Sequence, residues 1–312
     1  MSMLVGRIGV TENAARNLYG RLNDFAFERY GVREEDVAEE HVIAFIEHLP
    51  EQAPVLVDGW RRQMPMQRTL GIQFGALARH LRENGIHCPV THRAINYAEE
   101  LAERYAPEPI QAPAMSDDIF RETIDGCSTE TAGGKRDRAA FLVVRGTWAR
   151  PSEILRRMYP AEVRAEFREG IVIVVPSSKI NQRGEPEYLP IAHAPSERHC
   201  AVCALRDWLD YLGPDYKGPL FPRLDVNRRR PMASAMSTAD FNVQLRKAVN
   251  RVGLGAIHYS SYSLRRGPAT AAALRGEPLS KISEALRHEN YLQALTYIEA
   301  PAMFEMMKNV LA

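Results

Sequence analysis

The sequence lacks several features that mark special classes of protein. No stretch of its 312 residues approaches the roughly 20 consecutive apolar residues of a membrane-spanning helix. The first residues, MSMLVGRIGVTEN, show no apolar run followed by a small-residue cleavage site, so we expect no secretory leader. Four cysteines are too few for the disulfide framework of a secreted protein. These absences predict a protein of the reducing cytoplasm without a membrane partner.

The sequence also has almost no net charge, with 40 Lys and Arg against 39 Asp and Glu. This balance would argue against a nucleic-acid partner, but the charges are distributed unevenly. Ten Lys or Arg and two acids lie between Arg223 and Arg275, and five arginines without an acid lie between Arg61 and Arg82. Since the field near a surface follows local charge, a neutral total permits two basic faces. The alternative is that these arginines only form solvated helix faces.

Apolar spacing and proline content indicate two domains. Apolar residues recur every three or four positions in the first hundred residues, which predicts helices at about 11–30, 37–49, 66–83 and 92–105. Three prolines in residues 106–113 disfavour regular structure. We therefore expect a helical domain at 1–105, a linker at 106–114 and a second domain at 115–312.

The second domain is expected to mix helices with a small antiparallel β-sheet, so that the whole chain is mainly α (α+β). The β-branched run at 171–175 predicts a strand, the turn at 181–184 a hairpin, and 188–191 the partner strand. Helices are predicted at 116–127, 135–147, from 151, and at 202–212, 238–252, 263–275, 279–286 and 292–299.

Several cations and polar donors stand where a helix begins or a strand turns. Arg150 precedes a proline, Lys179 lies in the predicted hairpin, and Arg265 and Arg266 enter an alanine-rich helix. His288 and Tyr297 follow soon after. Together these residue types would suit a phosphodiester, because the planar fork of arginine matches two phosphate oxygens.

These segments resemble the tyrosine recombinase, or phage integrase, family over about residues 115–300. KRDRA at 135–139 with GTWARPSE at 146–153 resembles the first arginine box, and SLRRGPAT at 263–270 the second. Arg287-His288, followed nine residues after the histidine by Tyr297, matches the histidine–tyrosine box, and Lys179 lies between the arginine boxes as the family's lysine does. Each box alone is a weak signal, whereas their common order is specific.

The resemblance implies a reaction and a role for each matched residue. Tyr297 would attack the scissile phosphate, which leaves a 3′-phosphotyrosyl link and a free 5′-hydroxyl. Arg150 and Arg265 would hold the non-bridging oxygens, and His288 would add a hydrogen bond. Lys179 would give a proton to the 5′-oxygen. Because the covalent link conserves the ester, no ATP, metal or other cofactor is expected.

One position departs from the family pattern. Tyr262 stands three residues before Arg265, where the family usually has histidine. With a pKa of about 10, a phenol is a poor base at neutral pH. We favour an orienting contact by Tyr262, but His258 could take the role, or Tyr297 could be deprotonated in another way.

The resemblance also implies the partners. These are double-stranded DNA at a specific recombination site, a homo-tetramer on paired sites, and possibly other recombinase subunits, in the cytoplasm at the nucleoid. The helical first domain is compatible with the family's core-binding domain on looser grounds. Candidate phosphate contacts are Arg61, Arg62, Arg68, Arg79, Arg82 and Arg266.

Two other functions stay open beside an active recombinase or integrase of a mobile element. One is a DNA-binding accessory protein with impaired catalysis, which Tyr262 would explain. The other is an enzyme that relaxes or resolves DNA without exchanging partners.

A short cysteine motif and the C-terminal tail add two further expectations. His199-Cys200-x-x-Cys203 invites a zinc interpretation, but no second ligand pair appears at finger spacing, so we expect ordinary cysteines and no metal. In the tail, Phe304, Met307 and Leu311 share one helical face. This face either docks on a neighbouring protomer, as in the family, or packs on its own domain.

Overall fold

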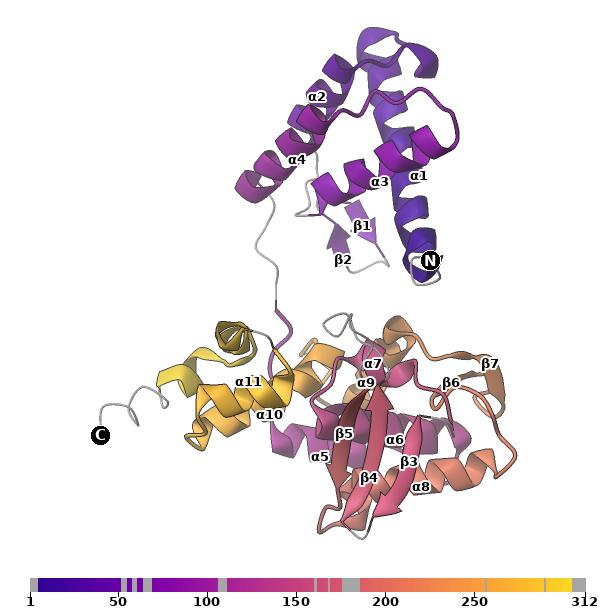
Figure 1. Ribbon diagram of the computed structural model, residues 1–312, viewed down its shortest axis with the longest axis vertical. Helices are drawn as coiled ribbons and strands as arrows, with labels where there is room; N and C mark the ends of the chain where they lie inside the picture. Colours follow the sequence, from indigo (N-terminus) through magenta and orange to yellow (C-terminus); the bar gives the residue numbers. More distant parts are fainter. Residues whose placement is uncertain are drawn as a thin grey trace. The chain divides into compact units, whose positions relative to one another are not determined.

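The chain forms two compact units, Met1–Ile110 and Gln111–Ala312. The computed structural model describes residues 5–51, 55–57, 61–63, 69–105, 111–159, 162–167, 169–175, 186–255, 257–288 and 290–304. Figure 1 shows the elements of each unit. Within the described residues, no helix combines the length and the hydropathy needed to cross a membrane.

The first unit is built from helices. Its helices are α1 (Val5–Tyr30), α2 (Glu39–His48), α3 (Leu70–Glu83) and α4 (His92–Tyr105). Its short elements are the 3-10 turns η1 (Glu34–Asp36) and η2 (Leu49–Glu51) and the antiparallel strands β1 (Val55–Val57) and β2 (Arg61–Gln63). Leu22, Phe45 and Phe74 are fully buried between the helices. The apolar spacing therefore predicted the helices, whereas the β1–β2 pair was missed.

The second unit consists of helices around a small sheet. Its helical elements are α5 (Asp117–Asp125), α6 (Ala132–Thr147), α7 (Pro151–Leu155), η3 (Glu197–His199), α8 (Ala201–Leu212), α9 (Thr238–Arg251), α10 (Ser261–Leu274), α11 (Leu279–Leu286) and η4 (Tyr291–Tyr297). The segment η4 is a 3-10 helix where the sequence predicted a helix at 292–299.

The strands β3 (Val163–Phe167), β4 (Gly170–Val175) and β5 (Glu187–Ala192) form an antiparallel sheet in that order. Ile173 pairs with Leu189 in the register between β4 and β5. The sheet packs on α6 and α8 through β5, as Figure 1 illustrates. A second antiparallel pair, β6 (Pro222–Leu224) and β7 (Pro231–Ala235), completes the unit. The predicted turn and Lys179 lie between β4 and β5 in sequence, outside the described residues.

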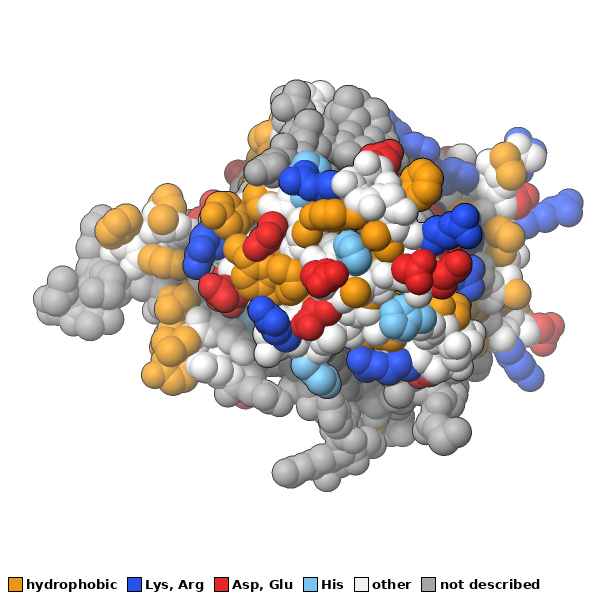
Figure 2. Space-filling model, turned by 90° about the horizontal axis from the view of Figure 1, so that it is seen from above, with side chains coloured by type: hydrophobic (Ala, Val, Ile, Leu, Met, Phe, Trp, Pro, Cys, Tyr) orange, Lys and Arg blue, Asp and Glu red, His pale blue; other side chains and the backbone are white. Residues whose placement is uncertain are grey.

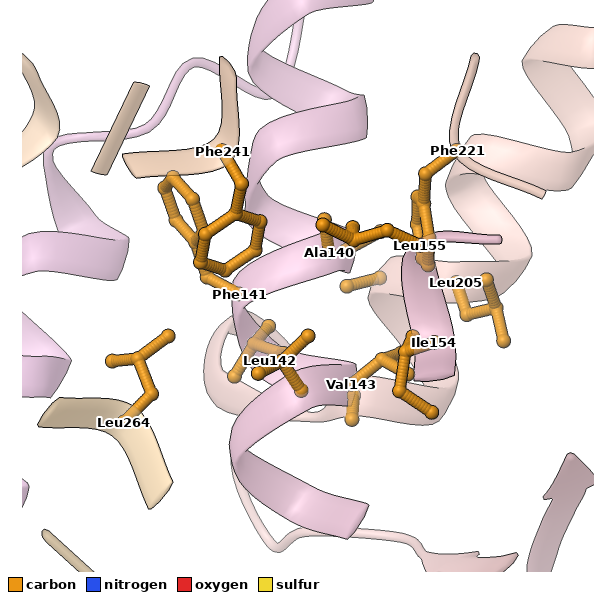
Figure 3. Packing of buried hydrophobic residues seen from close by; sticks show 14 of the residues in the cluster. Ala140, Phe141, Leu142, Val143, Ile154, Leu155, Leu205, Phe221, Phe241 and Leu264 are labelled. Atoms are coloured by element: carbon orange, nitrogen blue, oxygen red, sulfur yellow. The ribbon is translucent and has the colours of Figure 1, made fainter. Parts of the chain in front are cut away.

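Helix α6 is the centre of the second unit. Every residue from Arg136 to Arg145 on it is buried, as expected for a helix covered on all sides. Phe141 meets Phe241 edge to face, with ring centroids 5.0 Å apart, and Leu205 and Phe221 pack on the other side (Figure 3). Helix α6 ends at Trp148, which takes a left-handed conformation with φ 51°.

A smaller apolar cluster joins α10, α11 and η4. Ala269, Ala273, Leu286 and Ile298 are buried in it, and Trp148 and Tyr297 pack against its edge. The small side chains of α10 allow the three segments to approach closely. This cluster places the end of α6, the end of α11 and Tyr297 beside one another.

Candidate active site

Arg265 is the cation at the centre of the candidate site. It lies in the second turn of α10 and is 0% exposed. Its Nη1 donates to the carbonyl oxygen of Trp148 at 2.7 Å, and its Nη2 donates to the carbonyl oxygen of Leu286. Burial lowers the pKa of Arg265 to about 10, so the guanidinium still carries its charge at neutral pH. Arg265 thus ties the ends of α6 and α11 to α10.

His288 accepts a hydrogen bond from this guanidinium. Nη2 of Arg265 lies 3.1 Å from Nε2 of His288. Because a guanidinium only donates, Nε2 must accept, and the proton of the neutral imidazole must sit on Nδ1. Burial, together with the charges of Arg265, Arg150 and Arg287, lowers the pKa of His288 to about 4. Nδ1 is buried without a hydrogen-bond partner among the described residues, so its N–H can donate to a further acceptor.

Tyr297 packs beside both groups. Its ring centroid lies 5.0 Å from that of His288 and 5.1 Å from Cζ of Arg265, a cation–π distance. Thr270 of α10 holds the backbone, because its hydroxyl donates to the carbonyl oxygen of Tyr297 at 3.2 Å and accepts the amide of Glu299 at 3.3 Å. The phenol is therefore placed by contacts on its ring and its main chain.

Arg150 joins the site through a buried carboxylate. Arg150 caps α7, where Glu153 accepts its backbone N–H at 2.9 Å and its Nη1 at 3.3 Å. The same carboxylate accepts Nη2 of Arg287, whose Nη1 donates to Glu187 of β5. Burial would raise the pKa of Glu153, but Arg287 and the Arg150 amide outweigh it, and the net pKa is lowered. Glu153 is 7% exposed and is held as a carboxylate between two arginines.

Arg287 occupies an unusual backbone position. It ends α11 with φ 54°, in the left-handed region that favours glycine. Its two ion pairs, to α7 and β5, hold the side chain across this turn. The next residue is His288, so the turn sets the direction of the imidazole.

The structure thus brings together four of the six predicted catalytic residues. Contacts run without a break from Arg150 through Glu153 and Arg287 to His288, and from there to Arg265 and Tyr297. The link from Arg150 through Glu153 and Arg287 to His288 was not predicted from the sequence, since a pairing across 134 positions leaves no local signal.

Two predicted catalytic residues are not part of these contacts. Lys179 lies outside the described residues. Tyr262 lies one turn before Arg265 on α10 and is 48% exposed, and His258 is exposed just before that helix.

The predicted phosphate contacts are only partly within the described residues. Arg68 and the side chains of Arg61 and Arg62 fall outside them. Arg79 and Arg82 are exposed on α3, and Arg82 donates to the carbonyl oxygen of Val90. Arg266 is half-buried and donates to the carbonyl oxygen of Ala112.

The face of the molecule in Figure 2 carries charges of both signs. Figure 2 shows acidic and basic side chains side by side on that face, among hydrophobic ones. This face is therefore neither uniformly basic nor uniformly acidic.

A sequence comparison finds a recombinase relative. The chain is 31% identical over 192 residues, or 60% of its length, to the "Integrase/recombinase xerD homolog" of Selenomonas ruminantium. The match covers 55% of that protein, so the chain spans about half the length of the curated relative it matches. No family model matches the chain.

Solved structures show a likeness in fold. The XerH site-specific recombinase bound to its difH substrate has a TM-score of 0.56 at 15% identity, covering 91% of this chain and 73% of that one. A lambda integrase (75-356) dimer bound to a COC′ core site has a TM-score of 0.54 at 14% identity, covering 96% and 89%. The integrase of transposon Tn1549 in complex with transposon right-end DNA has a TM-score of 0.54 at 13% identity, covering 96% of this chain and 94% of that one. The predicted fold class, mainly α with small antiparallel sheets, is confirmed.

Proposed function

We propose that this chain, which has the fold of the tyrosine recombinases and resembles them in sequence, is a site-specific DNA recombinase. It would cleave and rejoin DNA strands through a transient bond between Tyr297 and the scissile phosphate. The observation that carries this proposal is the contact of a buried guanidinium, a neutral imidazole and a phenol at Arg265, His288 and Tyr297.

The donors that remain unused in this cluster support phosphate chemistry. Of the five N–H donors of a guanidinium, Arg265 uses three on Trp148, Leu286 and His288, which leaves two. Nε of Arg265 and Nδ1 of His288 are both buried without a partner among the described residues, so a phosphate has to enter the cluster to use them, and the side chain of Arg150 is 24% exposed. Donors fixed in place before the reaction stabilise the charge that develops on the non-bridging oxygens. In the proposed site, side-chain donors therefore stabilise the negative charge on the phosphate oxygens.

The proposed cleavage step forms one bond and breaks another. The oxygen of Tyr297 attacks phosphorus, the bond from phosphorus to the 5′-oxygen breaks, and a general acid protonates the leaving 5′-oxygen. We assign the acid to Lys179, which lies between two paired strands in sequence. Rejoining is the reverse attack by a 5′-hydroxyl, and the conserved ester needs no ATP.

His288 acts in this scheme as a donor and not as the base. Its Nε2 lone pair already accepts from Arg265, and its Nδ1 carries the proton. The proton of Tyr297 must therefore leave to another acceptor. Tyr262 is proposed as an orienting residue, since a phenol is a poor base at neutral pH.

The remaining parts of the proposal concern partners. We propose residues 1–105 as a DNA core-binding domain with Arg79 and Arg82 among its phosphate contacts, 106–114 as the linker, and 115–312 as the catalytic domain. Double-stranded DNA is the substrate, and the active form is a homo-tetramer on paired sites in the cytoplasm. The structural relatives that support this include a lambda integrase tetramer bound to a Holliday junction.

The test is covalent trapping on DNA. Nicked duplexes made from the DNA that flanks the gene would be incubated with the chain and resolved in SDS. We expect an SDS-resistant adduct that disappears in Tyr297→Phe, while this variant still binds the duplex. Tyr291→Phe, in the same segment η4 and 58% exposed, is the matched control and should retain the adduct.

The other outcomes separate the competing functions. DNA binding without an adduct in the wild type would contradict the proposal and favour an accessory protein. An adduct that persists in Tyr297→Phe would exclude Tyr297 as the nucleophile. Adduct formation without strand exchange on paired sites would indicate an enzyme that only relaxes or resolves DNA.

A further inference from the structure

Away from the candidate active site, three metal-ligating side chains meet between β5 and α8. We infer that His193, Cys200 and Cys203 bind a zinc ion. Their ligand atoms all lie within 4.8 Å of one another. This inference goes beyond the proposed function and does not depend on it.

The spacing of the ligand atoms fits zinc. Nδ1 of His193 lies 3.6 Å from Sγ of Cys200. Zinc binds a thiolate at about 2.3 Å and an imidazole nitrogen at about 2.0–2.1 Å in a tetrahedron, which places these two atoms about 3.6 Å apart and two sulfurs about 3.8 Å apart. Closing the site around an ion therefore needs at most about an ångström of movement by Cys203.

The chemistry of the ligands also favours zinc. Two thiolates and one imidazole form a soft donor set, whereas magnesium and calcium prefer oxygen ligands. Three protein ligands leave a fourth position for solvent. Cys200 is buried, Cys203 is half-buried and His193 is exposed, so the cluster reaches from the interior to the surface.

The backbone around Cys200 supports a thiolate. Its Sγ accepts the amides of Ala194 and Cys203, each at 3.4 Å. Hydrogen bonds of this kind orient metal ligands and tune their affinity. Cys200 is also the N-cap of α8, and capping alone would account for its position. Capping does not account for His193 and Cys203, which converge on the same sulfur.

The segment that carries the ligands is held in place by two arginines, of which Arg138 is buried and Arg198 is half-buried. Arg138 of α6 donates to the carbonyl oxygens of Glu197 and Arg198 at 2.7 and 3.0 Å. Arg198 in turn donates to the carbonyl oxygens of Ile124 and Cys127 at 2.9 and 2.7 Å. The ligands are therefore positioned before an ion arrives, which lowers the entropic cost of binding.

From the sequence we expected no metal here because no second ligand pair appears at finger spacing, and the histidine considered with the two cysteines was His199. His199, next to Cys200 in the chain, contacts Asp125 instead, with Nε2 3.0 Å from Oδ1. His193 takes its place, seven positions before Cys200, because the chain turns between the end of β5 and the start of α8.

The test is a titration of the purified, reduced full chain with Co²⁺ alone, followed by displacement with Zn²⁺. Tetrahedral Co²⁺ with thiolate ligands gives a sulfur-to-metal charge-transfer band in the near ultraviolet and strong visible d–d bands. We expect one ion per chain with both features, bleached by Zn²⁺. Cys203→Ser and His193→Ala should each weaken binding by about tenfold or more, because loss of a mere outer-shell partner of a metal ligand already costs about 10–100-fold.

Cys88→Ser is the matched control, because it removes a partly buried thiol from the other unit and should leave the titration unchanged. Circular dichroism would establish that each variant is folded. If Cys203→Ser does not fold, His193→Ala provides the test of the site, because the side chain of His193 is exposed and its replacement should leave the fold intact. Absence of the charge-transfer band, or an equal titration in the wild type and His193→Ala, would overturn the inference.

Discussion

Replacing Arg265 by lysine separates the chemistry of the guanidinium from its charge. The carbonyl oxygens of Trp148 and Leu286 accept from two different nitrogens of Arg265. A lysine carries its three donors on a single nitrogen, which cannot take the places of both Nη1 and Nη2, so we expect one of these carbonyls to lose its partner inside the protein. A buried acceptor left without a hydrogen bond costs about 1–3 kcal/mol. We therefore expect the free energy of unfolding to fall by about 2 kcal/mol.

The effect on DNA cleavage should be larger than the effect on stability. The lysine cannot hold Trp148, Leu286 and His288 and also present two donors to a phosphate. Removing one preorganised donor of a transition-state oxyanion typically lowers the rate by about 10²–10³-fold. We expect a loss of this size in single-turnover formation of the covalent adduct, with DNA binding retained.

The measurements are urea unfolding and adduct kinetics, at a temperature where all variants are folded. Arg145→Lys is the matched control, since Arg145 is also buried and donates to the carbonyl oxygen of Met115 at 3.0 Å, outside the site. It should lose similar stability and cleave at the wild-type rate. If Arg265→Lys cleaves as fast as the wild type, or if Arg145→Lys is equally slow, the assignment of Arg265 is wrong.

Three further outcomes are expected. The pKa of His288 is lowered to about 4 from an ordinary value of about 6.5, so the unfolded chain takes up the proton first. The stability contributed by the neutral ring is complete above about pH 6.5 and is lost as the pH falls toward 4. In His288→Gln, the urea midpoint of unfolding should therefore vary less with pH over this window. If the midpoint of the variant varies with pH as that of the wild type does, the folded protein does not hold a neutral imidazole at this position. Glu153→Gln should cost about 3 kcal/mol at pH 7, because it leaves two arginines without their shared carboxylate. As the pKa of Glu153 is lowered on folding, this contribution is present above about pH 4.5 and is lost as the pH falls through the pKa of the folded carboxyl. The stabilities of the wild type and the variant should therefore approach each other in acid, and a difference that stays constant with pH would contradict the ion-pair explanation. Tyr262→Phe should leave stability within about 0.5 kcal/mol and slow adduct formation by less than about tenfold, the worth of one hydrogen bond, whereas a complete loss would make Tyr262 essential.

Local sequence patterns predicted most of the helices and strands. The apolar spacing predicted α1 to α4 because a helix repeats every 3.6 residues, and the β-branched run predicted β4 because such side chains suit a pleated strand. The pair β1–β2 and the 3-10 form of η4 were missed, since short elements are decided by their surroundings more than by propensity.

The sequence by itself determined which chemical groups were available and in what order they follow along the chain. The tertiary structure decided which of them meet. Arg287 reaches Glu153 across 134 positions, and His193 rather than His199 joins Cys200. The protonation of His288 also depends on the fold, because Arg265 occupies Nε2 only when α10 packs on α11. Contacts between distant segments depend on packing, and a local pattern of residues does not contain them.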